Sequence, residues 1–206
     1  MKKIKFLSLV LWMISTLAIT TSCNNDDDNN IDPNQRQFGI FKVLEDDETI
    51  EMNGVIGSST LTDFNNLSSI YPNIKTINIK ECEGSMDDEI NLQVSLKVHQ
   101  KGIVTHLMDN GLIASGGVDF FLAGVTRTAG SNTMIGVHSW SDGTNQATDF
   151  PVGHQVHQQY IDYYKSIGFT QADAESFYYF TINAAPASSI HYMTEAEIEQ
   201  YNILKP

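Results

Sequence analysis

The stretch KTINIKECEGSMDDEINLQVSLKVHQKGIVTHLMDNGLIASGGVDFFLAGV, residues 75–125, contains two kinds of hydrophobic pattern in turn. Residues 75–82 alternate apolar and polar positions, as a half-buried strand does, whereas residues 87–100 place apolar side chains at helical spacing. A further strand is expected at residues 103–108, and a mostly apolar, hence buried, helix at residues 115–125. This strand–helix–strand–helix order predicts an α/β fold, with helices packed on a mostly parallel sheet.

The same succession of elements extends on both sides of this stretch. Asn110-Gly111 is a turn signal and is expected to end the strand that starts at residue 103. Thr194 opens a capping-box pattern, which predicts the start of a last helix. Further strands are expected at residues 51–57, 126–129 and 133–137, and further helices at residues 59–70, 154–167 and 171–182.

Three polar features follow predicted strands. Gly84-Ser85 lies where the strand of residues 75–82 turns into a helix. Ser115 lies at the apex of a second such turn, GLIASGG, where small neighbours allow a nucleophile to stand exposed. His138 ends the short apolar strand before it, 23 residues after Ser115. The order and spacing of the three features favour a catalytic site.

The chemistry of a serine nucleophile explains why these residue types are needed together. A serine hydroxyl attacks only when a base takes its proton, and a histidine within hydrogen-bond reach is the usual base. The negative oxygen that then develops needs two N–H donors. Ser115 is the candidate nucleophile and His138 the candidate base, with Gly84 or Ser85 supplying one donor and Gly116 the other.

Other residues admit a functional interpretation beside an ordinary structural one. Cys82 is a possible nucleophile, but no histidine is placed with it as His138 is with Ser115. Lys165 would suit a Ser–Lys mechanism, although a lysine on an amphipathic helix is usually solvated. The aromatic run at residues 177–180 suggests core and interface, or substrate binding. His154 and His157 have helical spacing but no recognisable third ligand, so no metal or cofactor is expected.

The N-terminus reads as a lipoprotein export signal. Residues 1–22 combine a basic head, an apolar run shorter than a membrane span and a small-residue cleavage site. Cys23 at the cleavage edge is the expected lipid attachment residue. The run NNDDDNN at residues 24–30 has no apolar residue and is expected to be a solvated spacer. The sequence thus predicts a signal peptide at residues 1–22, an acidic tether at residues 23–36 and one folded domain at residues 37–206.

Charge and cysteine content exclude several classes of function. Three lysines leave with the signal, so the mature chain holds nine Lys and Arg against 25 Asp and Glu, a formal charge of −16. Such a charge argues against nucleic-acid binding and against an electrostatic hold on anionic lipid. Membrane attachment is therefore expected through the lipid on Cys23. Only Cys82 remains besides it, so no internal disulfide is expected.

From about residue 53 to residue 204 the chain resembles the Clp-protease/crotonase superfamily, especially the exported Clp-protease-like proteins of bacteria. The resemblance rests on the strand at residues 75–82 and the Gly84-Ser85 turn that follows it. It rests also on ASGG at residues 114–117 and on the buried helix VDFFLAG at residues 118–124. It rests further on Arg127 and Asn132, on IGVHS at residues 135–139 and on YMTEAEIEQYNI at residues 192–203. The acidic spacer after Cys23 likewise resembles that of surface lipoproteins in Bacteroidetes-like bacteria.

The resemblance implies a spiral of repeated β-β-α units that usually oligomerises, with Ser115 as nucleophile, His138 as base and Gly84, Ser85 and Gly116 at the oxyanion hole. The chain departs from the family in two places. Gly-Ser replaces Gly-Gly, and no acidic residue precedes the YMTEAE segment, where the third member of a triad should lie. Asn183, Ser188 or a backbone carbonyl is left to orient His138.

Two functions remain open. The first is an exported serine peptidase at the outer membrane, on its periplasmic or cell-surface side, that acts on peptide or protein substrates. It would need no ATPase partner, because ATP is absent outside the cytoplasm, and for the same reason of export an acyl-CoA substrate is not expected. The second is a non-enzymatic binding or assembly lipoprotein on a degenerate Clp-protease-like scaffold, which the missing acid favours. Retention of serine, histidine and glycine at family spacing favours the first.

Overall fold

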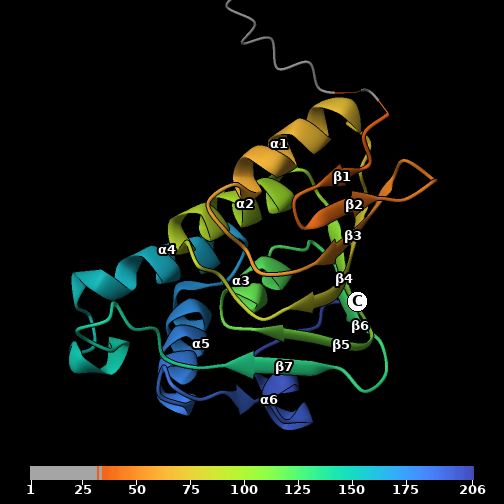
Figure 1. Cartoon of the computed structure of the whole chain (residues 1–206). Coiled ribbons are helices and arrows are strands. Elements are labelled where there is room, and N and C mark those ends of the chain that lie inside the picture. The colour runs from red at the N-terminus through yellow and green to blue at the C-terminus, as the bar shows by residue number, and fades with distance from the viewer. Residues whose placement is uncertain (1–31, 33) are drawn as a thin grey trace, which may run out of the picture. The chain divides into compact units, whose positions relative to one another are not determined.

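An eight-stranded sheet runs through the described part of the chain, Asp32 and residues 34–206 of this computed structural model (Figure 1). Its strands are β1 (Gln37–Phe38), β2 (Phe41–Val43), β3 (Thr49–Asn53), β4 (Thr76–Cys82), β5 (Val104–Ala114), β6 (Arg127–Ala129), β7 (Met134–Val137) and β8 (His191–Tyr192). Their order is β1-β2-β3-β4-β5-β7-β8, and β6 also pairs with β5. The pairs from β3 to β7 are parallel, and the outer pairs are antiparallel. The predicted α/β class with a mostly parallel sheet is confirmed.

The helices lie close to the positions that the sequence predicts. They are α1 (Thr60–Ile70), α2 (Asp88–Gln100), α3 (Gly116–Leu122), α4 (Gln158–Ser166), α5 (Gln171–Ala184) and α6 (Glu195–Gln200), with short 3-10 turns η1 (Ala147–Asp149) and η2 (Gln155–His157). Helix α2 contacts α1, α3 and α4, and all four lie on the same side of the sheet in Figure 1. No helix in the described range is both long and apolar enough to cross a membrane.

The strand pairing shows a structural repeat that is not visible as a repeat in the amino-acid sequence. The first half of β4 (residues 76–79) pairs with residues 104–107 of β5, and its second half (residues 81–82) pairs with residues 112–113. Strand β5 in turn pairs with β6 through its first half and with β7 through its second. Each turn of the chain therefore supplies two strand segments and one helix. The pairing confirms the β-β-α units expected from the resemblance.

Strand β5 is longer than predicted. Asn110-Gly111 does not end it, because the strand continues through both residues to Ala114. Asn110 takes a positive φ of 58° and donates its N–H to the carbonyl of Ser131 at 2.8 Å. The turn signal in the sequence thus marks an irregularity between two halves of one strand. The second half carries the chain directly to Ser115.

Local sequence signals account for the helix starts. Asp87 caps α2 by accepting a hydrogen bond from the N–H of Ile90 at 3.2 Å. The predicted capping box at α6 is confirmed, since Thr194 and Glu197 bond reciprocally to each other's backbone. Every residue of α3 is buried, as predicted, although the helix ends at Leu122. Strands β1, β2 and β8 were not predicted, because two or three residues are too short to show a hydrophobic period.

Arg127 joins the C-terminal segment to the rest of the domain. Its side chain is buried, with 5% of the residue exposed, and within the described part of the chain every hydrogen bond of its guanidinium goes to a backbone carbonyl. The carbonyls of Ile203 and Asn202 accept at 2.7 Å each, and that of Gly124 at 3.2 Å. Burial lowers the pKa of Arg127 to about 10, which leaves it charged at neutral pH.

Replacing Arg127 by methionine is expected to cost roughly 3 kcal/mol in the free energy of unfolding, because buried carbonyls lose a charged donor. Urea unfolding at pH 7 measures the change. The exposed Lys42 on β2 offers a control, and Lys42→Met should change stability by less than about 0.5 kcal/mol. Equal effects of the two substitutions would contradict this role for Arg127.

The predicted signal peptide (residues 1–22), Cys23 and most of the predicted tether at residues 23–36 lie outside the described residues.

Candidate active site

Ser115 joins β5 to α3 in an unusual backbone conformation. Its φ is 52° and its ψ is −130°, a combination that costs a non-glycine residue about 1–3 kcal/mol. Two hydrogen bonds hold the turn: the N–H of Ser115 donates to the carbonyl of Gly136 at 3.0 Å, and its carbonyl accepts from Val118 at 2.8 Å. The side chain forms no helix-capping hydrogen bond. The half-buried hydroxyl is therefore left available on a strained strand-to-helix turn.

The turn after β4 lies against the turn that carries Ser115. Gly84 has a φ of 147°, and a Cβ atom there would lie 3.2 Å from the Cβ of Ser115. A Cβ on Gly116 would overlap the hydroxyl of Ser85 and lie 2.8 Å from Nδ2 of Asn91. Glycine suits Gly84 because of its positive φ and the nearby Cβ of Ser115, and it suits Gly116 because the side chains of Ser85 and Asn91 leave no room for a Cβ atom.

The backbone N–H groups of these turns are unused. In the described range, the N–H groups of Gly84, Ser85 and Gly116 donate to no protein acceptor. Gly116 opens α3, where the first N–H groups of a helix have no intrahelical partner. Of the three predicted oxyanion residues, Gly116 is part of the lining of the cavity beside Ser115. Gly84 and Ser85 are not part of that lining, although Gly84 lies next to Ser115 and Ser85 next to Gly116.

His138 follows β7 and lies on the same cavity as Ser115. Its Nδ1 lies 2.7 Å from the carbonyl oxygen of Ser139, which can only accept a hydrogen bond. Nδ1 of the neutral ring therefore carries the proton, and Nε2 is the free acceptor that a general base requires.

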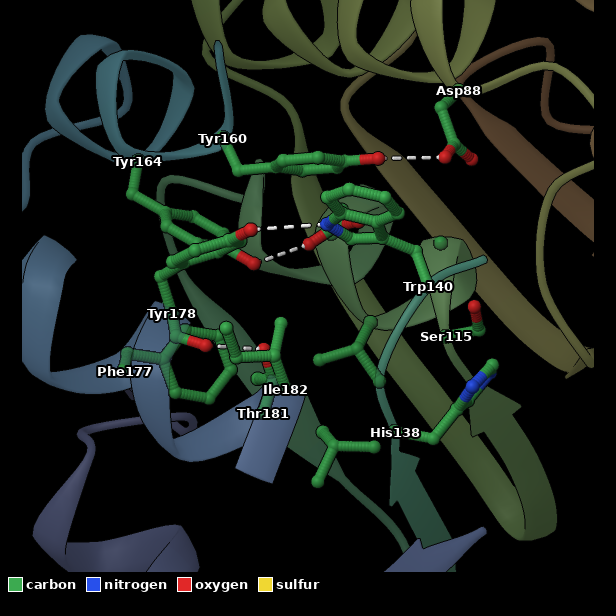
Figure 2. Close-up of a pocket in the computed structure, with 14 residues that line it drawn as sticks. Asp88, Ser115, His138, Trp140, Tyr160, Tyr164, Phe177, Tyr178, Thr181 and Ile182 are labelled. Atoms are coloured by element: carbon green, nitrogen blue, oxygen red, sulfur yellow. Dashed lines mark hydrogen bonds between the residues drawn. The ribbon is translucent and has the colours of Figure 1, made fainter. Parts of the chain in front are cut away.

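Figure 2 shows how the two side chains lie. The imidazole of His138 extends toward Ser115, while the hydroxyl of Ser115 points away from the ring. The two side chains form no hydrogen bond in this structure. A change of rotamer about the Cα–Cβ bond of Ser115 redirects the hydroxyl, and such bonds commonly tighten only when substrate is bound.

Neither of the two side chains predicted to orient His138 is bonded to it. Asn183 is exposed and donates to the carbonyl of Tyr179 on its own helix at 2.6 Å. Ser188 is exposed in the loop that follows α5. The third predicted partner was a backbone carbonyl, and the carbonyl of Ser139 does lie within hydrogen-bond distance of Nδ1 of His138. A carbonyl fixes the tautomer, but unlike a carboxylate it carries no full charge to stabilise the imidazolium.

The cavity beside Ser115, hereafter the Ser115 cavity, has a volume of about 50 Å³. Ser115 and His138 stand on one side of it, and aromatic residues of α4 and α5 stand opposite (Figure 2). The remaining lining residues come from α2, α3, β7 and the segment after it: Asp88, Gly116, Val118, Asp119, Val137 and Trp140. Those of α4 and α5 are Tyr160, Tyr164, Phe177, Tyr178, Thr181 and Ile182.

Two acidic residues that the sequence did not single out, Asp88 and Asp119, line this cavity. Asp119 is 9% exposed, and its Oδ1 accepts a hydrogen bond from the Tyr164 hydroxyl at 2.6 Å. Burial raises the pKa of Asp119 to about 7, the Tyr164 hydrogen bond opposes the rise, and the charge of Asp88 adds to it. Asp88 itself accepts from the hydroxyls of Ser85 and, at 2.7 Å, Tyr160. An isolated acid within the apolar run VDFFLAG was the signal that could have revealed Asp119.

The segment between β7 and α4 closes the cavity through one hydrogen-bond network. Trp140 donates its ring N–H to the hydroxyl of Tyr178 at 3.0 Å. Nε2 of His157 faces the carbonyl of Phe150 at 3.4 Å, so it carries the proton and Nδ1 accepts from Tyr178 at 2.7 Å. This network fixes the roof of the cavity to α5.

The other candidate residues have structural surroundings. Cys82 is fully buried, and burial raises the pKa of its thiol to about 11, so it is not a nucleophile at neutral pH. Lys165 is exposed and forms an ion pair with Asp162 at 3.2 Å, away from the lining of the Ser115 cavity. His154 stacks on Phe150, with ring centroids 4.9 Å apart.

The aromatic run at residues 177–180 has two parts. Phe177 and Tyr178 are buried and also line the Ser115 cavity. Phe180 stacks instead on Tyr201, with ring centroids 4.5 Å apart. Among the described residues, no group of three or more histidine, cysteine or acidic side chains is arranged to hold a metal ion.

Comparison with known proteins gives little at the level of sequence. No protein-family model matches the chain, and no curated protein matches it. Solved structures that are similar include a mutant of the 1510-N membrane-bound stomatin-specific protease in complex with a substrate peptide, at 19% identity and a TM-score of 0.48. The match covers 76% of this chain and 71% of that one. A second mutant of the same protease matches at 18% identity and a TM-score of 0.48, covering 76% and 75%.

Proposed function

We propose that this chain is a serine hydrolase that cleaves peptides, with Ser115 as nucleophile and His138 as general base. The observation that carries the proposal is the strained turn at Ser115, whose uncapped hydroxyl shares a cavity with a histidine in the correct tautomer. A turn that served only structure would hold glycine at a φ of 52° at lower cost. Peptides are proposed as substrates on the resemblance to Clp-type proteases described above.

The proposed reaction has two halves. Oγ of Ser115 forms a bond to the substrate carbonyl carbon while its proton moves to Nε2 of His138. The oxyanion accepts a hydrogen bond from the N–H of Gly116, the one predicted oxyanion residue that lines the Ser115 cavity. His138 then gives the proton to the leaving amine as the C–N bond breaks. In the second half, water attacks the acyl-enzyme, His138 takes the proton of that water, and Ser115 is restored.

Anchoring at the membrane is part of the proposal. The predicted signal at residues 1–22 would deliver the chain to the outer membrane, and the lipid on Cys23 would hold it there. This location rests on the sequence patterns alone. Peptide cleavage by this scheme consumes only water, so it needs neither ATP nor a cofactor.

A fluorophosphonate probe tests the proposal. Its phosphorus bonds to Oγ of an activated serine and fluoride leaves, so wild-type protein should be labelled on the peptide that contains Ser115. Labelling should vanish in Ser115→Ala and persist in Ser189→Ala, which removes an exposed serine of the loop after α5. Absence of labelling in folded wild-type protein would favour the alternative, a non-enzymatic binding or assembly lipoprotein.

A further inference from the structure

The lining of the Ser115 cavity is acidic. Two carboxylates, Asp88 and Asp119, belong to its lining, and no lysine or arginine does. A buried carboxylate is normally compensated by a cation or by several hydrogen-bond donors. Asp119 has neither among the described residues, where the hydroxyl of Tyr164 alone donates to its carboxylate.

The second carboxylate oxygen of Asp119 is the unsatisfied atom. Oδ1 accepts from Tyr164, whereas Oδ2 accepts no hydrogen bond from the described residues. Asp119 is nine-tenths buried, and no fully buried side-chain oxygen or nitrogen in the described range lacks a partner. Oδ2 therefore retains a small accessible area, and since Asp119 lines the cavity we infer that this area faces the cavity.

The other walls suit a cation as well. Tyr160 and Tyr178 stack with ring centroids 5.5 Å apart, and Trp140, Tyr164 and Phe177 also belong to the lining. Aromatic faces attract ammonium and guanidinium groups through their negative π surface. A cavity of about 50 Å³ has room for a few water molecules, which is the scale of a side-chain end group.

We propose that the Ser115 cavity binds the cationic end of a lysine or arginine side chain, so that the hydrolase prefers a basic residue on the acyl side of the cleaved bond. The proposal rests on the proposed hydrolase function and adds its substrate class. Asp119 lies four residues after Ser115, one turn further along α3, so nucleophile and carboxylate are presented by the same helix. A bound cation supplies the missing partner of Oδ2.

Lysine and norleucine esters provide the test, because norleucine has nearly the shape of lysine without the ammonium group. With the full-length chain in detergent at pH 8, kcat/KM for Nα-acetyl-lysine p-nitrophenyl ester should exceed that for the norleucine ester at least about tenfold, the smallest effect expected of a charge-assisted hydrogen bond. In Asp119→Asn the ratio should fall to near one. In Asp162→Asn, which alters an exposed acid of α4, the ratio should stay as in wild type.

Asp119→Asn retains an oxygen that can accept from Tyr164, and its melting temperature verifies folding. Asp88→Asn is a second variant, expected to lower the ratio by a smaller factor. A wild-type enzyme that cleaves the norleucine ester as fast as the lysine ester, or a folded Asp119→Asn protein that keeps the preference, would overturn the assignment.

A binding measurement separates this proposal from the hydrolase function. Butylammonium should quench or enhance the fluorescence of Trp140 in a saturable manner in Ser115→Ala, and butanol should not. Asp119→Asn should abolish the response. Butylammonium binding without ester hydrolysis would overturn the hydrolase and leave the cation site standing. Hydrolysis of both esters without butylammonium binding would overturn the cation site and leave the hydrolase function standing.

Discussion

His138→Gln is expected to hydrolyse p-nitrophenyl acetate roughly 10³-fold more slowly than the wild type in kcat/KM, because a glutamine side chain cannot take the proton of Ser115. The small ester needs no side-chain pocket, so the result is independent of the proposed lysine preference. Initial rates at pH 8 measure the loss.

His106→Gln is the matched control for this prediction. His106 lies in the first half of β5, outside the lining of the Ser115 cavity, and its Nδ1 is 2.8 Å from the hydroxyl of Thr128. Its substitution should leave the rate within about twofold of wild type. If His138→Gln keeps the wild-type rate, another group acts as base and the assignment of His138 fails.

The second large effect concerns stability and pH. Asp119 has a pKa of about 7 in the folded protein, raised by burial from an ordinary value of 3.8. Between these two values the folded state binds more protons than the unfolded state, so stability falls as pH rises. The fall amounts to on the order of 4 kcal/mol between pH 4 and pH 8.

Asp119→Asn should remove this dependence, since an amide does not titrate. Relative to wild type, the variant should differ little in free energy of unfolding at pH 4 and be more stable by several kcal/mol at pH 8. Urea unfolding at pH 4, 6 and 8 makes the comparison, with the exposed Asp162→Asn as control. A difference that does not grow with pH would show that Asp119 titrates normally.

The proposed cation site and the predicted pH dependence of stability both depend on the carboxylate of Asp119. A charged Asp119 destabilises the empty protein at neutral pH, and a cation in the Ser115 cavity would offset that cost. The proposed preference for a basic substrate residue and the loss of stability at high pH would therefore depend on the same carboxylate.

Much of the fold could be predicted from the local pattern of apolar and polar residues. Residues 75–82 and 87–100 predicted β4 and α2 to within one residue at each end, because a strand and a helix differ in the period of their apolar positions. Strand β5 was predicted too short, since Asn110-Gly111 has the composition of a turn and only pairing with β4 and β7 shows that the strand continues to Ala114.

The candidate site was predictable where it depends on the backbone. Small residues around Ser115 indicated a tight turn, and the turn is present with a positive φ. The partners of His138 and Asp119 were not predictable. Tyr164 is 45 residues from Asp119 in sequence, and the bond between them depends on how α4 packs against α3. The carbonyl that holds His138 belongs to the adjacent residue, and carbonyls leave no mark in a sequence.

The conformation of Ser115 has a further consequence for the history open to such a chain. A glycine at this position would relax the backbone, give a sturdier protein and remove the hydroxyl in a single step. Selection for stability alone would favour that replacement. A single replacement at residue 115 would thus give a more stable protein without the hydroxyl, and the chain holds serine at this position.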